Sequence, residues 1–128
     1  MIDIKNKEFI SQVKVFSGIK IGSISPTDID GFLDFGNKLF IFIEAKYGVS
    51  SLKGGQKLAL ERLCDACQTD TRTSILIITN HLAENDIDVG NTIVQKYRYK
   101  GKWFVPKPIK LKDAVNKFHT KFVKEKNT

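Results

Sequence analysis

Long apolar runs, cysteines and linker-like segments are all scarce in this sequence. No window approaches the ~18 apolar residues that a membrane-crossing helix needs, so we expect no membrane partner. The N-terminal residues MIDIKNKEF have no apolar run behind their positive charges, and without such a secretory signal the expected compartment is the cytoplasm. No Pro/Gly/Ser-rich stretch divides the 128 residues, so we expect one domain spanning residues 1–128.

The two cysteines, Cys64 and Cys67, are too few for a structural zinc site. No second cysteine pair exists, and the histidines are His81 and His119, so four zinc ligands are not evident. A redox-active pair would stand where a strand gives way to a helix, whereas this pair falls late in its predicted helix. We therefore expect both cysteines to be structural and buried.

Positive charge is concentrated at the C-terminal end. The segment from Lys100 to Thr128 carries nine lysines and two acids, whereas residues 1–99 carry twelve charges of each sign. A basic segment of this kind is the expected footprint of a polyanion-binding surface, because lysines that neutralise phosphates release condensed counterions. The alternative is a solvated helix face that only confers solubility. The candidate nucleic-acid-binding residues are Lys112, Lys117, Lys121 and Lys124.

Hydrophobic periodicity predicts a chain of mixed strands and helices. Alternation and unbroken apolar runs indicate strands, and apolar residues three or four apart indicate helices. In chain order we expect a helix over 4–16, strands over 19–24, 30–35 and 39–43, a helix over 55–67 with Leu60, Leu63 and Cys67 on one face, a strand over 74–79, a hairpin from 92–99 and 103–105, and an amphipathic helix over 111–124.

The predicted hairpin carries aromatic residues interleaved with basic ones. These aromatics could stack on nucleic-acid bases, but about half of them must face the core whatever the function. The residues concerned are Tyr97, Tyr99, Trp103 and Phe104.

Two acids are expected to meet at one end of the strand over 39–43. This apolar run predicts a central strand buried on both faces, and it ends at Glu44, where a charge has no packing role. The turn over 36–38 makes a hairpin, so the start of the preceding strand, at Asp30, lies beside Glu44. Glu44 and Lys46 share a face because side chains alternate along a strand, and Ala45 points back into the core.

Such a cluster suits magnesium and phosphodiester chemistry. Mg²⁺ prefers hard oxygen ligands, usually one or two carboxylates completed by waters and substrate oxygens. Asp30, Glu44 and the backbone carbonyl of Ala45 are the expected metal ligands, and Lys46 is placed to orient or activate water. An ion pair that closes a strand end in a non-catalytic binding module is the alternative for Glu44 and Lys46.

Together these residues resemble the signature of the PD-(D/E)xK nucleases. Pro26 and Asp30 stand loosely for its first half, and Glu44-Ala45-Lys46 for its second, after the apolar run LFIFI. The resemblance implies a restriction-endonuclease-like α/β fold, a mixed β-sheet flanked by helices, and DNA cleavage that depends on Mg²⁺, with Mn²⁺ as a substitute. The resemblance is nearest to the small virus-type replication-repair nucleases and the Holliday junction resolvases. If a phage encodes the chain, the expected compartment is the cytoplasm of the host.

Three further residues follow from that resemblance. Gln56 resembles the glutamine that many members carry on the helix after the (D/E)xK strand, near the scissile phosphate. Glu8 resembles an additional metal-ligating acid on the first helix of some members. The first acid of the signature departs from the usual spacing, because it does not directly follow the proline; Asp30 is preferred for its closeness to Glu44, and Asp28 is kept as a helper or substitute.

The expected function is therefore a metal-dependent nuclease acting on DNA, including branched or flapped DNA, with RNA not excluded. The competing classes are a nucleic-acid-binding module without catalysis and an interaction protein whose lysines only confer solubility. A one-site nuclease of 128 residues needs a dimer or two visits to cut both strands, so a homodimer is expected.

Overall fold

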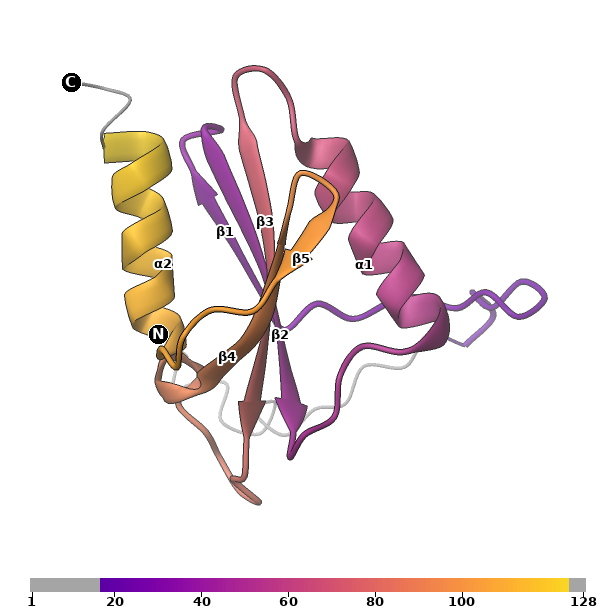
Figure 1. Cartoon of the computed structure of the whole chain (residues 1–128). Helices are drawn as coiled ribbons and strands as arrows, with labels where there is room; N and C mark the ends of the chain where they lie inside the picture. Colours follow the sequence, from indigo (N-terminus) through magenta and orange to yellow (C-terminus); the bar gives the residue numbers. More distant parts are fainter. Residues whose placement is uncertain (1–16, 125–128) are drawn as a thin grey trace, which may run out of the picture.

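In the computed structural model of this protein, residues 17–124 are described, and strands alternate with helices (Figure 1). The strands are β1 (Gly31–Phe35), β2 (Leu39–Tyr47), β3 (Thr73–His81), β4 (Ile93–Tyr99) and β5 (Lys102–Phe104). The helices are α1 (Gly54–Cys67), the short 3-10 helix η2 (Val89–Asn91), α2 (Leu111–His119) and its π-helical continuation η3 (Thr120–Lys124). The helix expected over 4–16, with Glu8, lies outside the described residues.

The five strands form one mixed sheet in the order β1-β2-β3-β4-β5. The central pair, β2 and β3, is parallel, and the other neighbouring pairs are antiparallel. A parallel pair requires a crossover connection, and α1 provides it. The predicted α/β class, a mixed sheet flanked by helices, is confirmed.

The β1–β2 hairpin forms where the sequence predicts it. Gly36 and Asn37 both adopt positive φ angles, 61° and 63°, which glycine and asparagine tolerate best. The turn is closed by the Lys38 N–H, which donates to the Phe35 carbonyl at 3.1 Å. This tight turn fixes the strand register and pairs Gly31 with Ile43, so Asp30 comes to the carboxyl end of β2.

The sheet is covered on both faces, as the apolar runs of β2 and β3 predict. Figure 1 shows α1 on one face and α2 on the other. Alternate residues of β2 divide between two cores: Ile41 and Ile43 pack under α2, whereas Phe42 packs with Leu60 of α1. Glu44 follows Phe42 on the α1 face because side chains alternate along the strand.

Two details of the sequence prediction are wrong. Residues 19–24 do not join the sheet: Gly22, at φ 61°, reverses the chain, and Ile21 and Ile24 bond to each other as an isolated bridge. On α1 the buried face contains Leu60 and Cys64, while Leu63 is exposed. Residues four apart, such as 60 and 64, lie on the face of the helix that packs on the sheet, whereas position 63 is turned toward the edge of that face.

Cys64 behaves as a structural cysteine, as expected. Its side chain is buried, and the Ser74 hydroxyl donates to its sulfur at 3.5 Å. Burial raises the pKa of the Cys64 thiol to about 11, so the thiolate is disfavoured near neutral pH. Cys67 is half-buried and packs beside the same core.

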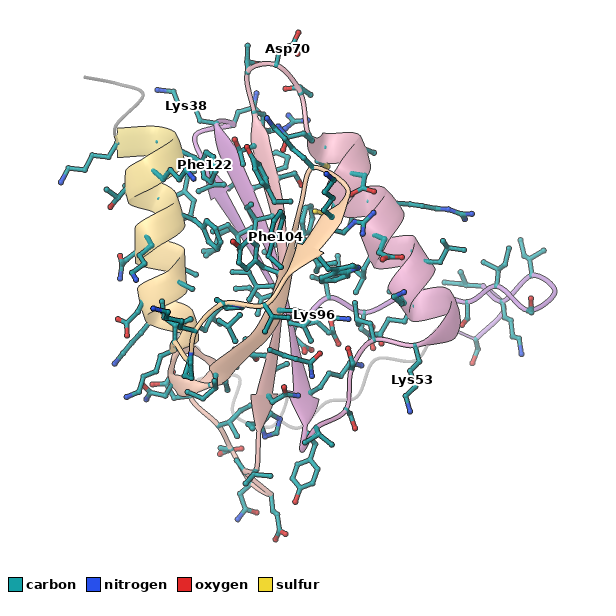
Figure 2. The ribbon with its side chains drawn as sticks, in the orientation of Figure 1. Lys38, Lys53, Asp70, Lys96, Phe104 and Phe122 are labelled. Atoms are coloured by element: carbon teal, nitrogen blue, oxygen red, sulfur yellow. The ribbon has the colours of Figure 1, made fainter. Side chains whose placement is uncertain are left out.

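The C-terminal helix is an amphipathic cap, as predicted. Leu111, Ala114 and Phe122 are buried against the sheet, and Figure 2 shows Phe122 between the helix and the strands. The lysines proposed to bind nucleic acid are all exposed on α2 and η3; they are Lys112, Lys117, Lys121 and Lys124. They lie on the face of the sheet opposite to α1.

Candidate active site

Three polar side chains meet on the α1 face of the sheet, at the carboxyl end of β2. The Lys46 ammonium donates to Gln56 Oε1 at 2.7 Å, and Gln56 Nε2 donates to Glu44 Oε1 at 3.2 Å. Lys46 Nζ also lies 3.6 Å from Glu44 Oε1. Strand alternation places Glu44 and Lys46 on one face, and the N-terminal turn of α1 places Gln56 above them. The sequence prediction that brought these residues together agrees with this geometry.

Glu44 is a charged group in a buried position. Its residue is only 5% exposed, and its Oε2 atom is buried without a hydrogen-bond partner among the described residues. Burial and then the nearby Asp30 carboxylate raise the pKa of Glu44, while the Lys46 charge, the nearby Asp30 backbone and the hydrogen bond from Gln56 oppose that rise. A buried, incompletely paired carboxylate is costly for the fold, and such groups concentrate at functional sites.

Asp30 lies at the same end of β2, just before β1 begins. Its Oδ2 atom accepts from the Ala45 N–H at 2.8 Å. The N–H and C=O of one residue in a strand point to the same side, so the Ala45 carbonyl also points toward the side of Asp30. Two carboxylates and one carbonyl are therefore near each other, as the sequence predicted.

The donor set fits a hard divalent cation. Within residues 17–124, no three His, Cys, Asp or Glu side chains gather closely enough to form a metal site by themselves. Mg²⁺ commonly takes one or two carboxylates and fills its other positions with water and substrate oxygens, so two carboxylates are enough. The unpaired, buried Oε2 of Glu44 is the atom that such a cation would satisfy.

Asn80 and Gln95 form a second polar network beside the cluster, which the sequence prediction missed. Asn80 pairs in register with Lys46 across the parallel strands. Its Nδ2 donates to the Ser50 carbonyl at 3.0 Å, Gln95 Nε2 donates to the same carbonyl at 3.0 Å, and Gln95 also donates to Asn80 Oδ1 at 2.8 Å. These bonds anchor the loop that leads into α1 and Gln56. A polar residue ending the buried run SILIIT was the available signal.

Asp28 and Lys112 line clefts on different sides of the cluster. Asp28 lies in the loop over 23–28, which with Gln56 and Arg62 lines a cleft of about 620 Å³. Lys112 lines a cleft of about 430 Å³ that also includes Asp30. Of the four candidate nucleic-acid-binding lysines, Lys112 is the one that lines this cleft with Asp30.

The interleaved aromatics of the β4–β5 hairpin are mainly packing residues. Tyr97 contacts Phe118 edge-on at 5.0 Å, and Tyr99 lies 5.4 Å from Phe122, so both rings pack under α2. On the other face, Trp103 Nε1 donates to Glu61 at 2.7 Å. Three of the four aromatics are thus held by the two helices.

Comparisons with protein-family models, with curated proteins and with solved structures found no match. Between residues 17 and 124, no helix has the length and apolar character needed to cross a bilayer. The fold and the site define a small α/β protein with a partly buried acid–lysine–glutamine cluster at the carboxyl end of its central strand.

The raised pKa of Glu44 predicts a pH-dependent stability. Folding favours the protonated form, so the metal-free protein should lose stability as pH rises from the ordinary value of 4.5 through the raised value, and the loss should persist above it. Glu44→Gln does not titrate, so its advantage in free energy of unfolding over the wild type should grow across that window. Urea unfolding of both proteins in EDTA, between about pH 4 and 8, measures this difference. A difference independent of pH would contradict the assignment.

Proposed function

We propose that this protein is a metal-dependent nuclease that hydrolyses phosphodiester bonds of DNA. The observation that carries the proposal is the Oε2 atom of Glu44, buried and without a partner among residues 17–124, beside a second carboxylate and a lysine. A structural ion pair would be expected to satisfy both oxygens of a buried carboxylate. A cation-binding carboxylate keeps one oxygen free for its ligand.

The roles of the residues follow from their chemistry. Asp30, Glu44 and the Ala45 carbonyl would hold Mg²⁺, with Mn²⁺ as a substitute, which supplies charge neutralisation of the phosphate and a more acidic water. Lys46 provides a fixed positive charge for the attacking water or the developing charge on phosphate. Gln56 contacts both Lys46 and Glu44, and so holds the amine away from full pairing with the carboxylate.

The proposal includes membership of the PD-(D/E)xK class with its restriction-endonuclease-like fold. Support comes from the order of elements: an acid before a hairpin, the Glu44-Ala45-Lys46 strand, a helix bearing Gln56, then a parallel strand. The proposed substrates include branched or flapped DNA. Asp28 and Glu8 remain proposed as additional acids; Asp28 lines a cleft beside Gln56, and Glu8 lies outside the described residues.

The direct test is to incubate the purified chain with plasmid, single-stranded, branched and flapped DNA, and with RNA, in Mg²⁺, Mn²⁺ or EDTA. Metal-dependent cutting supports the proposal. Salt-sensitive binding without cutting would instead indicate a binding module. If the chain neither cuts nor binds nucleic acid, the interaction-protein alternative would be favoured.

The basic helix gives a separate prediction about nucleic-acid affinity. Replacing Lys112, Lys117, Lys121 and Lys124 with glutamine keeps helix propensity and removes up to four phosphate contacts. Affinity should fall and its salt dependence should flatten, by about 0.9 in the log–log slope for each lost contact with duplex DNA. Fluorescence anisotropy over a salt series measures both quantities. An unchanged slope in a folded variant would assign these lysines to solubility alone.

A homodimer is part of the proposal, because one site per chain cuts both strands in one encounter only when two chains act together. Light scattering at working concentration tests it. A strictly monomeric protein would contradict the homodimer proposal but not the proposed chemistry of the single site.

A further inference from the structure

An exposed aromatic ring stands next to the acid pair on β1. Phe32 pairs in register with Phe42, which is two residues before Glu44 on β2, so the side chains of Phe32, Phe42 and Glu44 are on the α1 face. Phe42 is buried, but Phe32 is 49% exposed. The helix α1 packs mainly on β3 and β4, so among the described residues no helix covers the β1 side of this face.

The ring of Phe32 is supported from beneath. It stacks on Phe42 with centroids 5.0 Å apart and planes 29° apart, and it meets Phe40 edge-on at 5.1 Å. Further along the strand, the Arg72 guanidinium lies 4.4 Å from the centre of the Phe40 ring. These contacts restrict how the Phe32 ring can turn while leaving about half of the residue open to solvent.

The order of groups along this face matches a polynucleotide. The cation-binding acids and Lys46 come first, the exposed ring follows one side-chain repeat of ~6.7 Å further along the strand, and the guanidinium of Arg72 comes after it. Phosphates bind at cations and bases stack on aromatic rings, and this combination is typical of single-strand binding. An apolar protein partner would instead have to bury the charged groups on both sides of the ring.

We propose that Phe32 stacks on an unpaired base beside the phosphodiester bond held at Glu44, so that the substrate is single-stranded or locally unpaired nucleic acid. This inference rests on the proposed nuclease function and narrows its substrate class. Bases inside a duplex are stacked on their neighbours and cannot also stack on a side chain. Free ends, flaps and branch points offer such bases, whereas blunt uniform duplex does not.

A fluorescent residue at position 32 tests binding without requiring cleavage. Phe32→Trp, measured in Ca²⁺, a hard cation that carboxylates also bind, and against the wild-type signal of Trp103, should be quenched by a short single-stranded oligonucleotide and much less by its blunt duplex. The control is Val105→Trp, because Val105 is 80% exposed and directly follows β5, at the opposite edge of the sheet, and has no proposed binding role. Quenching at position 32 alone supports the inference, and equal quenching at both positions or at neither overturns it.

Iodide quenching of the same Phe32→Trp variant shows whether the chain itself or a second copy covers this face instead of nucleic acid. If the introduced indole is shielded from iodide in the free protein, the chain itself covers the face. Shielding that rises with protein concentration would mean that a second copy covers it. Either result overturns the inference.

Cleavage gives the second measurement. In Mg²⁺, Phe32→Leu should lower kcat/KM on single-stranded or flapped DNA by about tenfold, whereas Val105→Ala should not. A selective loss supports the inference, and equal activity of Phe32→Leu and wild type overturns it while leaving the nuclease proposal intact. If no substrate is cut but the Phe32→Trp variant is selectively quenched, the nuclease proposal fails and the base-stacking surface stands as a binding site.

Discussion

Glu44→Gln is expected to reduce metal-dependent cleavage by more than about 100-fold, because losing a direct ligand should cost at least as much as losing a residue that only orients one. The amide is nearly isosteric but brings no negative charge to the cation. The melting temperature in EDTA should stay the same or rise, since the substitution removes a buried carboxylate held next to Asp30. Cleavage assays and thermal unfolding on the same preparation measure both effects.

Two aspartates provide the control for this prediction. Asp30→Asn should resemble Glu44→Gln, because Asp30 is the second carboxylate of the site, close enough to raise the pKa of Glu44. Asp28→Asn should cost less, since Asp28 lies in the cleft beside Gln56. A reversed order would move the ligand to Asp28. Full activity of Glu44→Gln would remove the nuclease proposal, because the Asp30 site depends on a second carboxylate.

Lys46→Ala is expected to lower the rate of cleavage by about 100-fold or more, the usual cost of losing one preorganised charge at a reacting centre. The expected loss lies in kcat, because the two carboxylates that would bind the cation remain. Single-turnover cleavage at saturating Mg²⁺ measures the rate, and calorimetric titration of Mn²⁺ measures metal binding. Together they separate the chemical step from metal affinity.

Lys57→Ala is the matched control, because Lys57 lies one residue after Gln56 and pairs with Glu61 at 3.8 Å. A partly exposed pair of this kind contributes little, and the variant should keep activity within a few-fold of wild type. If Lys46→Ala and Lys57→Ala lose activity equally, the effect is one of general charge and not of position. If Lys46→Ala instead abolishes Mn²⁺ binding, Lys46 supports the acid pair and not the reaction.

The acid–lysine–glutamine cluster could be predicted because its determinants are local. An unbroken apolar run indicates a central strand, a Gly-Asn turn fixes the hairpin register, and strand alternation then puts Glu44 and Lys46 on one face. The buried state of Glu44 follows from the same run. Each step uses residues close together in sequence, where steric rules decide the outcome.

The features that escaped prediction depend on distant parts of the chain. Ser50 is anchored by Asn80 and Gln95, which no local pattern connects. The exposure of Phe32 depends on where α1 packs, and the strand register alone shows only that Phe32 shares a face with Glu44. Residues 19–24 alternate like a strand, but none of the strands within residues 17–124 pairs with them, and Gly22 reverses the chain.

The anchored loop before α1 also bears on the order in which the protein assembles during folding. Asp30, Glu44, Lys46 and Gln56 come from one hairpin and the helix after it, so closing the short loops between them costs little chain entropy. The bonds that anchor Ser50 span 30 and 45 residues and can form only after β3 and β4 have joined the sheet. The residues of the candidate site can therefore meet early, but the loop that carries them into α1 is anchored only by contacts of longer sequence separation.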